Sequence, residues 1–315
     1  MNISIFIHIG VGFKFVLIRK KVKNKFVNYS IVITTLFLIG GAIFLQIPRS
    51  SAPPPPTSEG SVNILIGAKN HKFNPENVTS IRPDIFQEGH FSMFDILVHL
   101  DDGGFIDMEY HFDSSMNTHV IDLLDQETNW WYEVYYSGGW PELNVFRMDH
   151  YAWKEDTTFK LYKEDKYFLE SVHSIFQDEV TRKINSGGDL ILPSVVIKGK
   201  TFTTEFADVL VTAHNIRNDT FQLGVITAID VILSLGDQGL IDYFLRWYDT
   251  IGDADVVRSY WVSGINDDIA HGTCGWVYES GDRLYKRFAG NHIHIPQDFR
   301  PLNSPDYYET FWICL

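Results

Sequence analysis

The stretch "FDILVHLDDGG" begins at Phe94, and a similar stretch, "ADVLVTAHNIRND", begins at Ala207. Each places an aspartate before three aliphatic residues and continues into polar, turn-forming residues. A short apolar run next to turn residues is typical of a strand that enters a hairpin. The two stretches therefore predict that one structural unit occurs twice in the chain.

Other landmarks recur in the same order and extend this predicted duplication. The matched pairs, separated by 108 to 123 positions, are Asp95 with Asp208, Asp122 with Asp230, Arg147 with Arg258, and Tyr162 with Tyr285. In each unit a short helical pattern follows the hairpin, at residues 119–126 and 228–236, and aromatic strands come next. We expect an α+β fold of two related grasp-like modules, residues 61–200 and 201–315, each with a helix covering one face of a mixed sheet.

A longer helical pattern covers residues 163–185, at the end of the first module. Its apolar residues fall at helical spacing, and they are Tyr167, Phe168, Val172, Ile175, Phe176 and Val180. The sequence "NSGG" then ends the pattern. A single apolar stripe on such a helix packs against a core more often than it binds a partner, so we predict a core helix.

Residues 26–47 are 22 consecutive residues without a charged side chain. As a helix rising about 1.5 Å per residue they span about 33 Å, close to the thickness of one hydrocarbon core. Residues 1–25 carry a basic cluster, and positively charged flanks stay in the cytoplasm. The sequence thus predicts one transmembrane helix in contact with the lipid bilayer, and a cleaved signal peptide is the alternative.

Residues 48–60 contain four consecutive prolines and favour an extended polyproline II conformation. They predict a stalk between the transmembrane helix and the folded modules. The predicted localisation is therefore the cell membrane, with a single pass, a cytoplasmic N-terminus and an extracellular C-terminal region.

The composition is acidic, with 26 Lys and Arg residues, 40 Asp and Glu residues and a formal net charge of −14. Nucleic-acid phosphates repel such a polyanion, so nucleic-acid binding is excluded as a function class. A solvated acidic surface is the main interpretation, and calcium binding by clustered carboxylates is the alternative. The carboxylate-bearing turns at residues 101–104 and 266–268 are interpreted as turn chemistry.

Residues 206–312 contain, in order, a helix start at Thr227, the sequence "SGIN" from Ser263 and "GWVY" from Gly275. This order resembles the carboxy-terminal domain of transcobalamin, a small β-rich module found in exported microbial surface proteins. The resemblance implies a fold and an extracellular location, and it suggests a corrinoid ligand by analogy alone. The chain departs from the family at residues 279–282, where members carry an Asn-Gly turn.

His271, His292 and His294 form a group of residues of metal-ligand type. His292 and His294 alternate on a predicted strand, which places both imidazoles on the same side. A divalent metal held there would allow an exported metal-dependent hydrolase that uses Asp267 or Asp268. Ordinary surface histidines are the plainer interpretation, so no cofactor and no catalytic residue is predicted.

The two cysteines, Cys274 and Cys314, lie near the ends of predicted strands. Because an even number of cysteines in an exported region favours pairing, we predict a disulfide between them. The bond would join the terminal strand to the loop that contains "GWVY".

Aromatic residues between positions 130 and 140 are denser than the core of one strand requires. Alternation along a strand leaves half of them facing outward, and aromatic platforms beside carboxylates commonly bind sugars. The candidate ligand-binding residues are Trp130, Trp131, Tyr135, Trp140, Trp276 and Tyr278. Packing against the second module or the long helix is the preferred interpretation of the aromatics at residues 130–140, and ligand binding is the alternative. We expect a binding protein for a glycan, a surface protein or a small ligand, with the metal-dependent hydrolase as the alternative function.

Overall fold

The computed structural model describes residues 62–136, 141–142, 146–250, 257–283 and 295–314. All of them belong to one compact unit, Pro53–Leu315. The predicted transmembrane helix at residues 26–47 and the predicted stalk at residues 48–60 lie outside the described residues.

The predicted single-pass membrane localisation is corrected by this structure. In the described part of the chain no helix is long and apolar enough to cross a bilayer.

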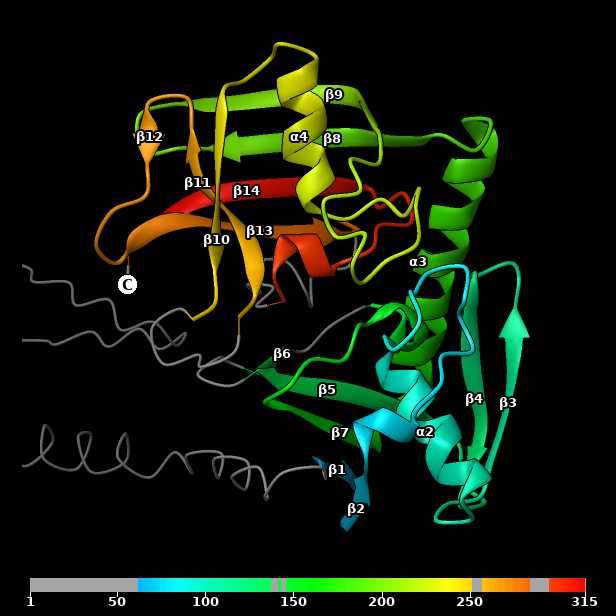
Figure 1. Ribbon diagram of the computed structural model, residues 1–315. Helices are drawn as coiled ribbons and strands as arrows, with labels where there is room; N and C mark the ends of the chain where they lie inside the picture. The colour runs from blue at the N-terminus through cyan, green and yellow to red at the C-terminus, as the bar shows by residue number, and fades with distance from the viewer. Residues whose placement is uncertain (1–61, 137–140, 143–145, 251–256, 284–294, 315) are drawn as a thin grey trace, which may run out of the picture. The chain divides into compact units, whose positions relative to one another are not determined.

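The first half of the described chain contains a central sheet, one helix and a separate hairpin (Figure 1). Its elements are β1 (Val62–Ile66), β2 (Lys69–Phe73), α2 (Met93–Asp102), β3 (Met108–Asp113), β4 (Thr118–Leu124), β5 (Trp130–Tyr136), β6 (Pro141–Glu142) and β7 (Thr157–Lys163), with short 3-10 helices at Pro75–Asn77 and Met148–His150. The sheet has the order β2-β1-β7-β5-β6, and β3 pairs only with β4. Strands β1 and β7 are parallel, whereas β2 and β5 are antiparallel to their neighbours.

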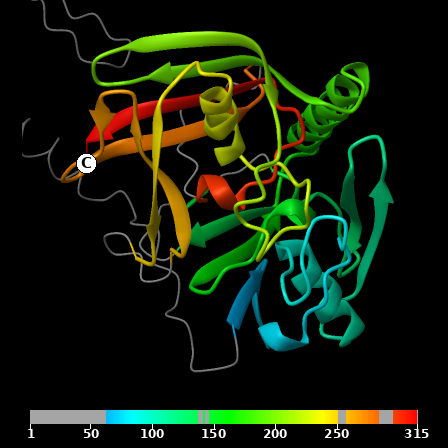
Figure 2. The ribbon, with the colours of Figure 1, turned by 45° about the horizontal axis from the view of Figure 1, so that its top comes forward.

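The second half repeats this arrangement after the long helix α3 (Lys166–Asn185). Its elements are β8 (Leu190–Lys198), β9 (Thr203–Val211), α4 (Ile229–Asp237), β10 (Tyr243–Tyr248), β11 (Ser259–Ile265), β12 (Asp268–Ile269), β13 (Cys274–Gly281) and β14 (Tyr307–Cys314), with a 3-10 helix at Gln297–Phe299. The main sheet has the order β13-β14-β8-β9, and β10, β11 and β12 form a second sheet (Figure 2). As in the first half, the two central strands, β14 and β8, are parallel.

The predicted alignment of the two modules is wrong. Asp95 lies in helix α2, whereas its proposed counterpart Asp208 lies in strand β9. The topology instead pairs α2 with α4 and β3 with β10, so that Asp95 corresponds to Asp230, 135 positions later. We call residues 62–163 repeat 1 and residues 190–314 repeat 2.

The stretch from Phe94 forms a helix rather than the predicted strand because of its cap. The Ser92 side chain accepts a hydrogen bond from the Asp95 backbone N–H, and the Asp95 carboxylate accepts one from the Ser92 backbone N–H at 2.6 Å. This capping box satisfies backbone N–H groups at the start of the helix that have no partner within the helix. Thr227 and Asp230 make the corresponding contact at α4, where the Thr227 N–H lies 2.7 Å from Asp230 Oδ2.

Residues 119–126 were predicted as a helix, but β4 occupies most of them. Their β-branched residues Val120 and Ile121 suit an extended backbone, and β4 pairs with β3 from Thr118 to Leu124. The predicted grasp-like modules, each with a hairpin, a helix and strands at these positions, are therefore corrected. The chain folds as mixed sheets in which strands predominate, with one helix of about ten residues in each repeat.

The described residues form two hydrophobic cores, one centred in each repeat, and Phe221, Ile295 and Phe299 of repeat 2 belong to the core of repeat 1. In repeat 1 the core also contains the buried stripe of α3, which lies within the range 163–185 that the apolar spacing indicated. In repeat 2 the helix α4 is buried along nearly its whole length against the main sheet (Figure 2). Both helices of the repeats therefore serve packing, which leaves the hairpins and loops to form a functional site.

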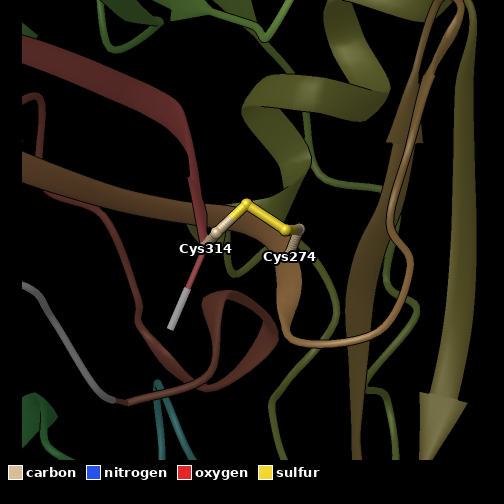
Figure 3. The surroundings of a disulfide bond; sticks show 2 residues. All are labelled: Cys274 and Cys314. Atoms are coloured by element: carbon tan, nitrogen blue, oxygen red, sulfur yellow. A yellow bond between two sulfur atoms is a disulfide. The ribbon is translucent and has the colours of Figure 1, made fainter.

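The predicted disulfide is confirmed. Cys274 and Cys314 are bonded, and they face each other as paired residues of the antiparallel strands β13 and β14 (Figure 3). The bond closes a loop with a sequence separation of 40 residues. It therefore fastens the outer strand β13 to β14, which is central in the sheet of repeat 2.

Replacing both cysteines by serine (C274S/C314S) is expected to lower the free energy of unfolding by about 3–4 kcal/mol, because the open chain gains loop entropy when it unfolds. Urea unfolding of the oxidised protein and the variant measures this difference. The wild-type protein unfolded in a reducing agent should match the variant. An unchanged midpoint in both comparisons would contradict a stabilising role for the bond.

Candidate functional site

Only one of the three predicted metal ligands, His271, lies in the described residues. His271 forms a β-bridge with Cys274, and its ring centroid lies 5.8 Å from that of Trp312. His292 and His294 lie outside the described residues. Within the described ranges no group of three or more His, Cys, Asp or Glu side chains is placed to hold a metal ion.

Most of the predicted ligand-binding aromatics belong to the hydrophobic cores. Trp131, Trp276 and Tyr278 are buried, and burial leaves them no face for a ligand. The Trp276 indole donates to the Asp268 carbonyl at 3.0 Å, and the Tyr278 hydroxyl donates to a backbone carbonyl. In the structure these three side chains contribute to core packing.

Of the other three predicted aromatics, Trp130, Tyr135 and Trp140, only Trp130 has a described side chain. Trp130 is partly buried, and Lys163 lies over its ring at 4.2 Å from the centroid. The Tyr135 side chain and the whole of Trp140 lie outside the described residues. The carboxylate Asp268, the first residue of β12, is buried and accepts from the Thr201 backbone N–H at 2.9 Å, a contact between segments that are distant in sequence.

A different constellation occurs once in each repeat, and it begins with an arginine. We call its copy in repeat 1 site A and define it by Arg82, Asp84, Phe112, His119 and Asp149. Arg82 binds Asp84 through two hydrogen bonds of 2.9 and 2.7 Å, and its Nη1 donates to Asp149 at 2.7 Å. One guanidinium is thus fixed by an exposed carboxylate on one side and a buried carboxylate on the other.

The buried carboxylate of site A is saturated with donors. The Thr118 hydroxyl donates to Asp149 Oδ1 at 2.5 Å, and the His119 backbone N–H donates to Oδ2 at 3.0 Å. The His119 imidazole Nδ1 also lies 3.0 Å from Oδ2. Burial opposes ionisation of Asp149, but the neighbouring histidines and Arg82 outweigh it and hold the pKa of this carboxyl well below its usual range.

Site B, in repeat 2, has the same plan and is defined by Arg217, Asp219, Trp247, Tyr260 and Asp298. Arg217 binds Asp219 through two hydrogen bonds of 2.9 Å, and its Nη1 donates to Asp298 at 3.0 Å. The Tyr260 backbone N–H donates to Asp298 at 2.8 Å, as His119 does to Asp149 in site A. The arginine, the two aspartates and the backbone donor are therefore equivalent in the two sites, whereas the aromatic residues differ.

Each arginine supports one exposed aromatic ring on the neighbouring hairpin. Arg82 lies 5.6 Å from the ring centroid of Phe112 on β3, and Arg217 lies 5.6 Å from that of Trp247 on β10. Phe112 is 47% exposed and Trp247 is 40% exposed, whereas both arginine side chains are almost completely buried. The guanidinium occupies one face of each ring, so the exposed area belongs to the rest of the ring.

Each exposed ring also packs against the ring of a neighbouring residue. The His119 ring centroid lies 5.1 Å from that of Phe112, and the Tyr260 centroid lies 5.0 Å from that of Trp247. The Trp247 indole donates to Asp249 at 3.1 Å. Beside site B a small recess with a volume of about 10 Å³ is lined partly by Asn215, Arg217, Gln222 and Thr227.

The two sites differ at the buried carboxylate. Asp298 Oδ1 has no hydrogen-bond partner among the described residues, whereas its equivalent in Asp149 accepts from Thr118. Ser259 takes the position of Thr118, but its hydroxyl donates to the Val257 carbonyl. Burial therefore raises the pKa of Asp298, although Arg217 partly offsets this effect.

Each site is completed by a side chain from the other repeat. Asn303 of repeat 2 accepts from Asn117 at 3.1 Å and lies 2.9 Å from His150 Nδ1, beside site A. Lys154 of repeat 1 donates to the Val257 carbonyl and to the Ser259 hydroxyl, beside site B. Burial lowers the pKa of Lys154 to about 7, with a partial offset from Asp298. Neither site would keep its supporting contacts in an isolated repeat.

His150 is buried next to site A and is neutral over the physiological range. Burial is the largest cause that lowers its pKa; Asp149 opposes the shift, Arg82 adds to it, and the resulting pKa is about 3. Its Nε2 lies 2.9 Å from the Asn117 carbonyl oxygen and 2.8 Å from Nη1 of Arg82, and its Nδ1 lies 2.9 Å from the Asn303 amide nitrogen.

Sequence reasoning missed these sites although a signal for them is present. Residues 81–87 read "IRPDIFQ" and residues 216–222 read "IRNDTFQ", with five identical positions. Both stretches lie in loops before α2 and α4, where hydrophobic periodicity carries no information. A search for repeated polar motifs would have found the arginine and the exposed aspartate of each site, but not the buried aspartates or the aromatic rings.

Each site presents an exposed carboxylate, Asp84 or Asp219, and an exposed ring, both of which contact the same guanidinium.

No family model matches the chain, and no curated protein or solved structure is significantly similar to it. The resemblance to the carboxy-terminal domain of transcobalamin therefore stays a prediction.

Replacing Asp149 by asparagine (D149N) is expected to lower the free energy of unfolding by about 3–5 kcal/mol, because it leaves the Arg82 charge buried without its buried partner. The matched variant D84N removes the exposed partner of the same arginine and should cost less than about 1 kcal/mol. Urea unfolding measures both. Equal losses in the two variants would contradict the assigned division between buried and exposed partners.

The buried neutral His150 is expected to make stability depend on pH. The unfolded chain binds a proton at this histidine near pH 6.5, whereas the folded protein binds it only near pH 3. Stability is therefore lost as the pH falls from about 6.5 towards 3, by about 1.4 kcal/mol per pH unit for this proton. H150Q, which does not titrate, should have a slope shallower by that amount in urea unfolding between pH 6 and 4. Identical slopes would show that His150 is protonated in the folded state.

Proposed function

We propose that the protein is a non-catalytic binding protein whose ligands are glycans, and that sites A and B are its ligand-binding sites. One observation carries the proposal. In both repeats an exposed aromatic ring and an exposed carboxylate are fixed to the same buried arginine.

The cost of building each site supports a role beyond packing. Burying a guanidinium and a carboxylate carries a large desolvation penalty, and apolar side chains of similar volume would often stabilise a fold as well. The buried pairs Arg82–Asp149 and Arg217–Asp298 hold the rings of Phe112 and Trp247 in place at the protein surface. A rigid ring loses little conformational entropy when a ligand packs on it, which is the property of an effective binding anchor.

The chemistry of each site fits a sugar. A pyranose has apolar C–H faces that pack on an aromatic ring and hydroxyls that donate to carboxylates. Asp84 and Asp219 are the acceptors, with side chains that are 62% and 58% exposed. A cationic ligand would meet a ring whose other face already contacts a guanidinium, and an anionic ligand would be repelled by a chain of net charge −14.

The alternative of a metal-dependent hydrolase depends on His271, His292 and His294. Only His271 lies in the described residues, where it packs beside Trp312. No contact of His271 favours a role in catalysis, so the binding function is preferred.

The double variant F112A/W247A is expected to weaken glycan binding at least about tenfold, since it removes the stacking surface of both sites and a tenfold change equals about 1.4 kcal/mol. Isothermal titration calorimetry with cellohexaose, laminarihexaose, chitohexaose and maltohexaose measures the affinities of the full chain. D84N/D219N should weaken binding through the loss of the two acceptors while leaving the rings in place.

The matched control is F105A/F244A, which removes two phenylalanines that are 64% and 53% exposed but belong to neither site. It should bind like the wild-type protein. The proposal fails if none of the four hexasaccharides binds the wild-type protein, or if the control loses as much affinity as F112A/W247A.

A further inference from the structure

We infer that sites A and B engage two separate glycan chains, so that one protein molecule bridges them. This inference rests on the proposed function and adds the number of ligands and their relative orientation. It follows from the contact through which the two repeats meet.

The repeats meet through equivalent residues. Phe86 of repeat 1 forms an antiparallel bridge with Phe221, its counterpart in repeat 2, and the two ring centroids lie 5.7 Å apart. The flanking Gln87 and Gln222 are also counterparts, and each side chain donates to the carbonyl of the phenylalanine in the opposite repeat, at 3.2 and 3.0 Å. Contacts of this reciprocal kind are those of a two-fold axis, as in a symmetric dimer.

The backbone repeats the same reciprocity. Gln87 N–H donates to the Thr220 carbonyl at 2.9 Å, and Gln222 N–H donates to the Ile85 carbonyl at 2.9 Å. Both glutamines end the motifs at residues 81–87 and 216–222, which also contain Arg82 and Arg217. The segment that forms the contact therefore also carries the arginine of each site, and the local two-fold axis relates site A to site B.

A two-fold axis restricts how a directional polymer can bind. A glycan chain has a reducing and a non-reducing end, and rotation about an axis perpendicular to it exchanges these ends. If the glycan chain runs parallel to the two-fold axis, the two sites lie on opposite sides of that axis. In neither case does one straight chain meet both sites in the same way. Two equivalent sites of this symmetry are therefore suited to two chains.

The two sites are fixed with respect to each other. Asn303 of repeat 2 supports site A, and Lys154 of repeat 1 supports site B. Because each repeat contributes to the other's site, rotation of one repeat would break contacts in both. The geometry points to a rigid bivalent binder, in which Trp247 offers the larger ring and Phe112 the smaller one.

The test is a count of bound ligands followed by a bridging assay. Titration of the wild-type chain with each of the four hexasaccharides should give about two ligands per molecule, whereas F112A and W247A should each give about one. Latex beads coated with the same hexasaccharides should be agglutinated by the wild-type protein and by F105A/F244A. Each single-site variant should bind the beads without agglutinating them.

The outcomes separate the inference from the function on which it rests. A stoichiometry of one for the wild-type protein, or agglutination that survives in F112A or W247A, would overturn the bivalent inference and leave glycan binding intact. Absence of binding to all four hexasaccharides would overturn the proposed function and the inference with it. Circular dichroism of the variants checks that a lost ligand reflects the site and not the fold.

Discussion

The buried contact between an arginine and an aspartate, made once in each repeat, is the constraint on which the functional surface depends. Arg82 and Arg217 each join a loop, a hairpin and a 3-10 helix that are distant in sequence. A buried ion pair adds little net stability compared with apolar packing, but it fixes geometry closely because each charge tolerates few alternatives. The exposed rings owe their positions to this arrangement.

The two copies of the constraint have diverged in their chemistry. In site A, Thr118 and His119 complete the hydrogen bonding of Asp149, and the carboxyl stays ionised. In site B one oxygen of Asp298 is left without a partner among the described residues, and burial raises the pKa of that carboxyl. The second site thus keeps the geometry of the first with weaker electrostatic support, while its tryptophan offers a larger contact surface.

The sequence predicted local features well and long-range relations poorly. The disulfide follows from the cysteine count, and the range of α3 and the position of α4 follow from apolar spacing. Helix α2 was missed because a short apolar run fits a strand or a buried helix equally, and only the Ser92–Asp95 cap decides between them. The buried aspartates of the sites lie far in sequence from their arginines, so no local pattern connects them.

Both main sheets are closed by strands that are distant in sequence, since β1 pairs in parallel with β7, and β8 pairs in parallel with β14. Pairings of this kind form slowly, because a long loop must close before any contact is gained. Because the chain contains two units of the same topology, it could also misfold by pairing β1 with β14 or β8 with β7. The unlike lengths and sequences of β1 and β8, with Pro193 within β8, oppose such exchange during folding. Divergence between the repeats therefore protects the kinetics of assembly as well as differentiating the two sites.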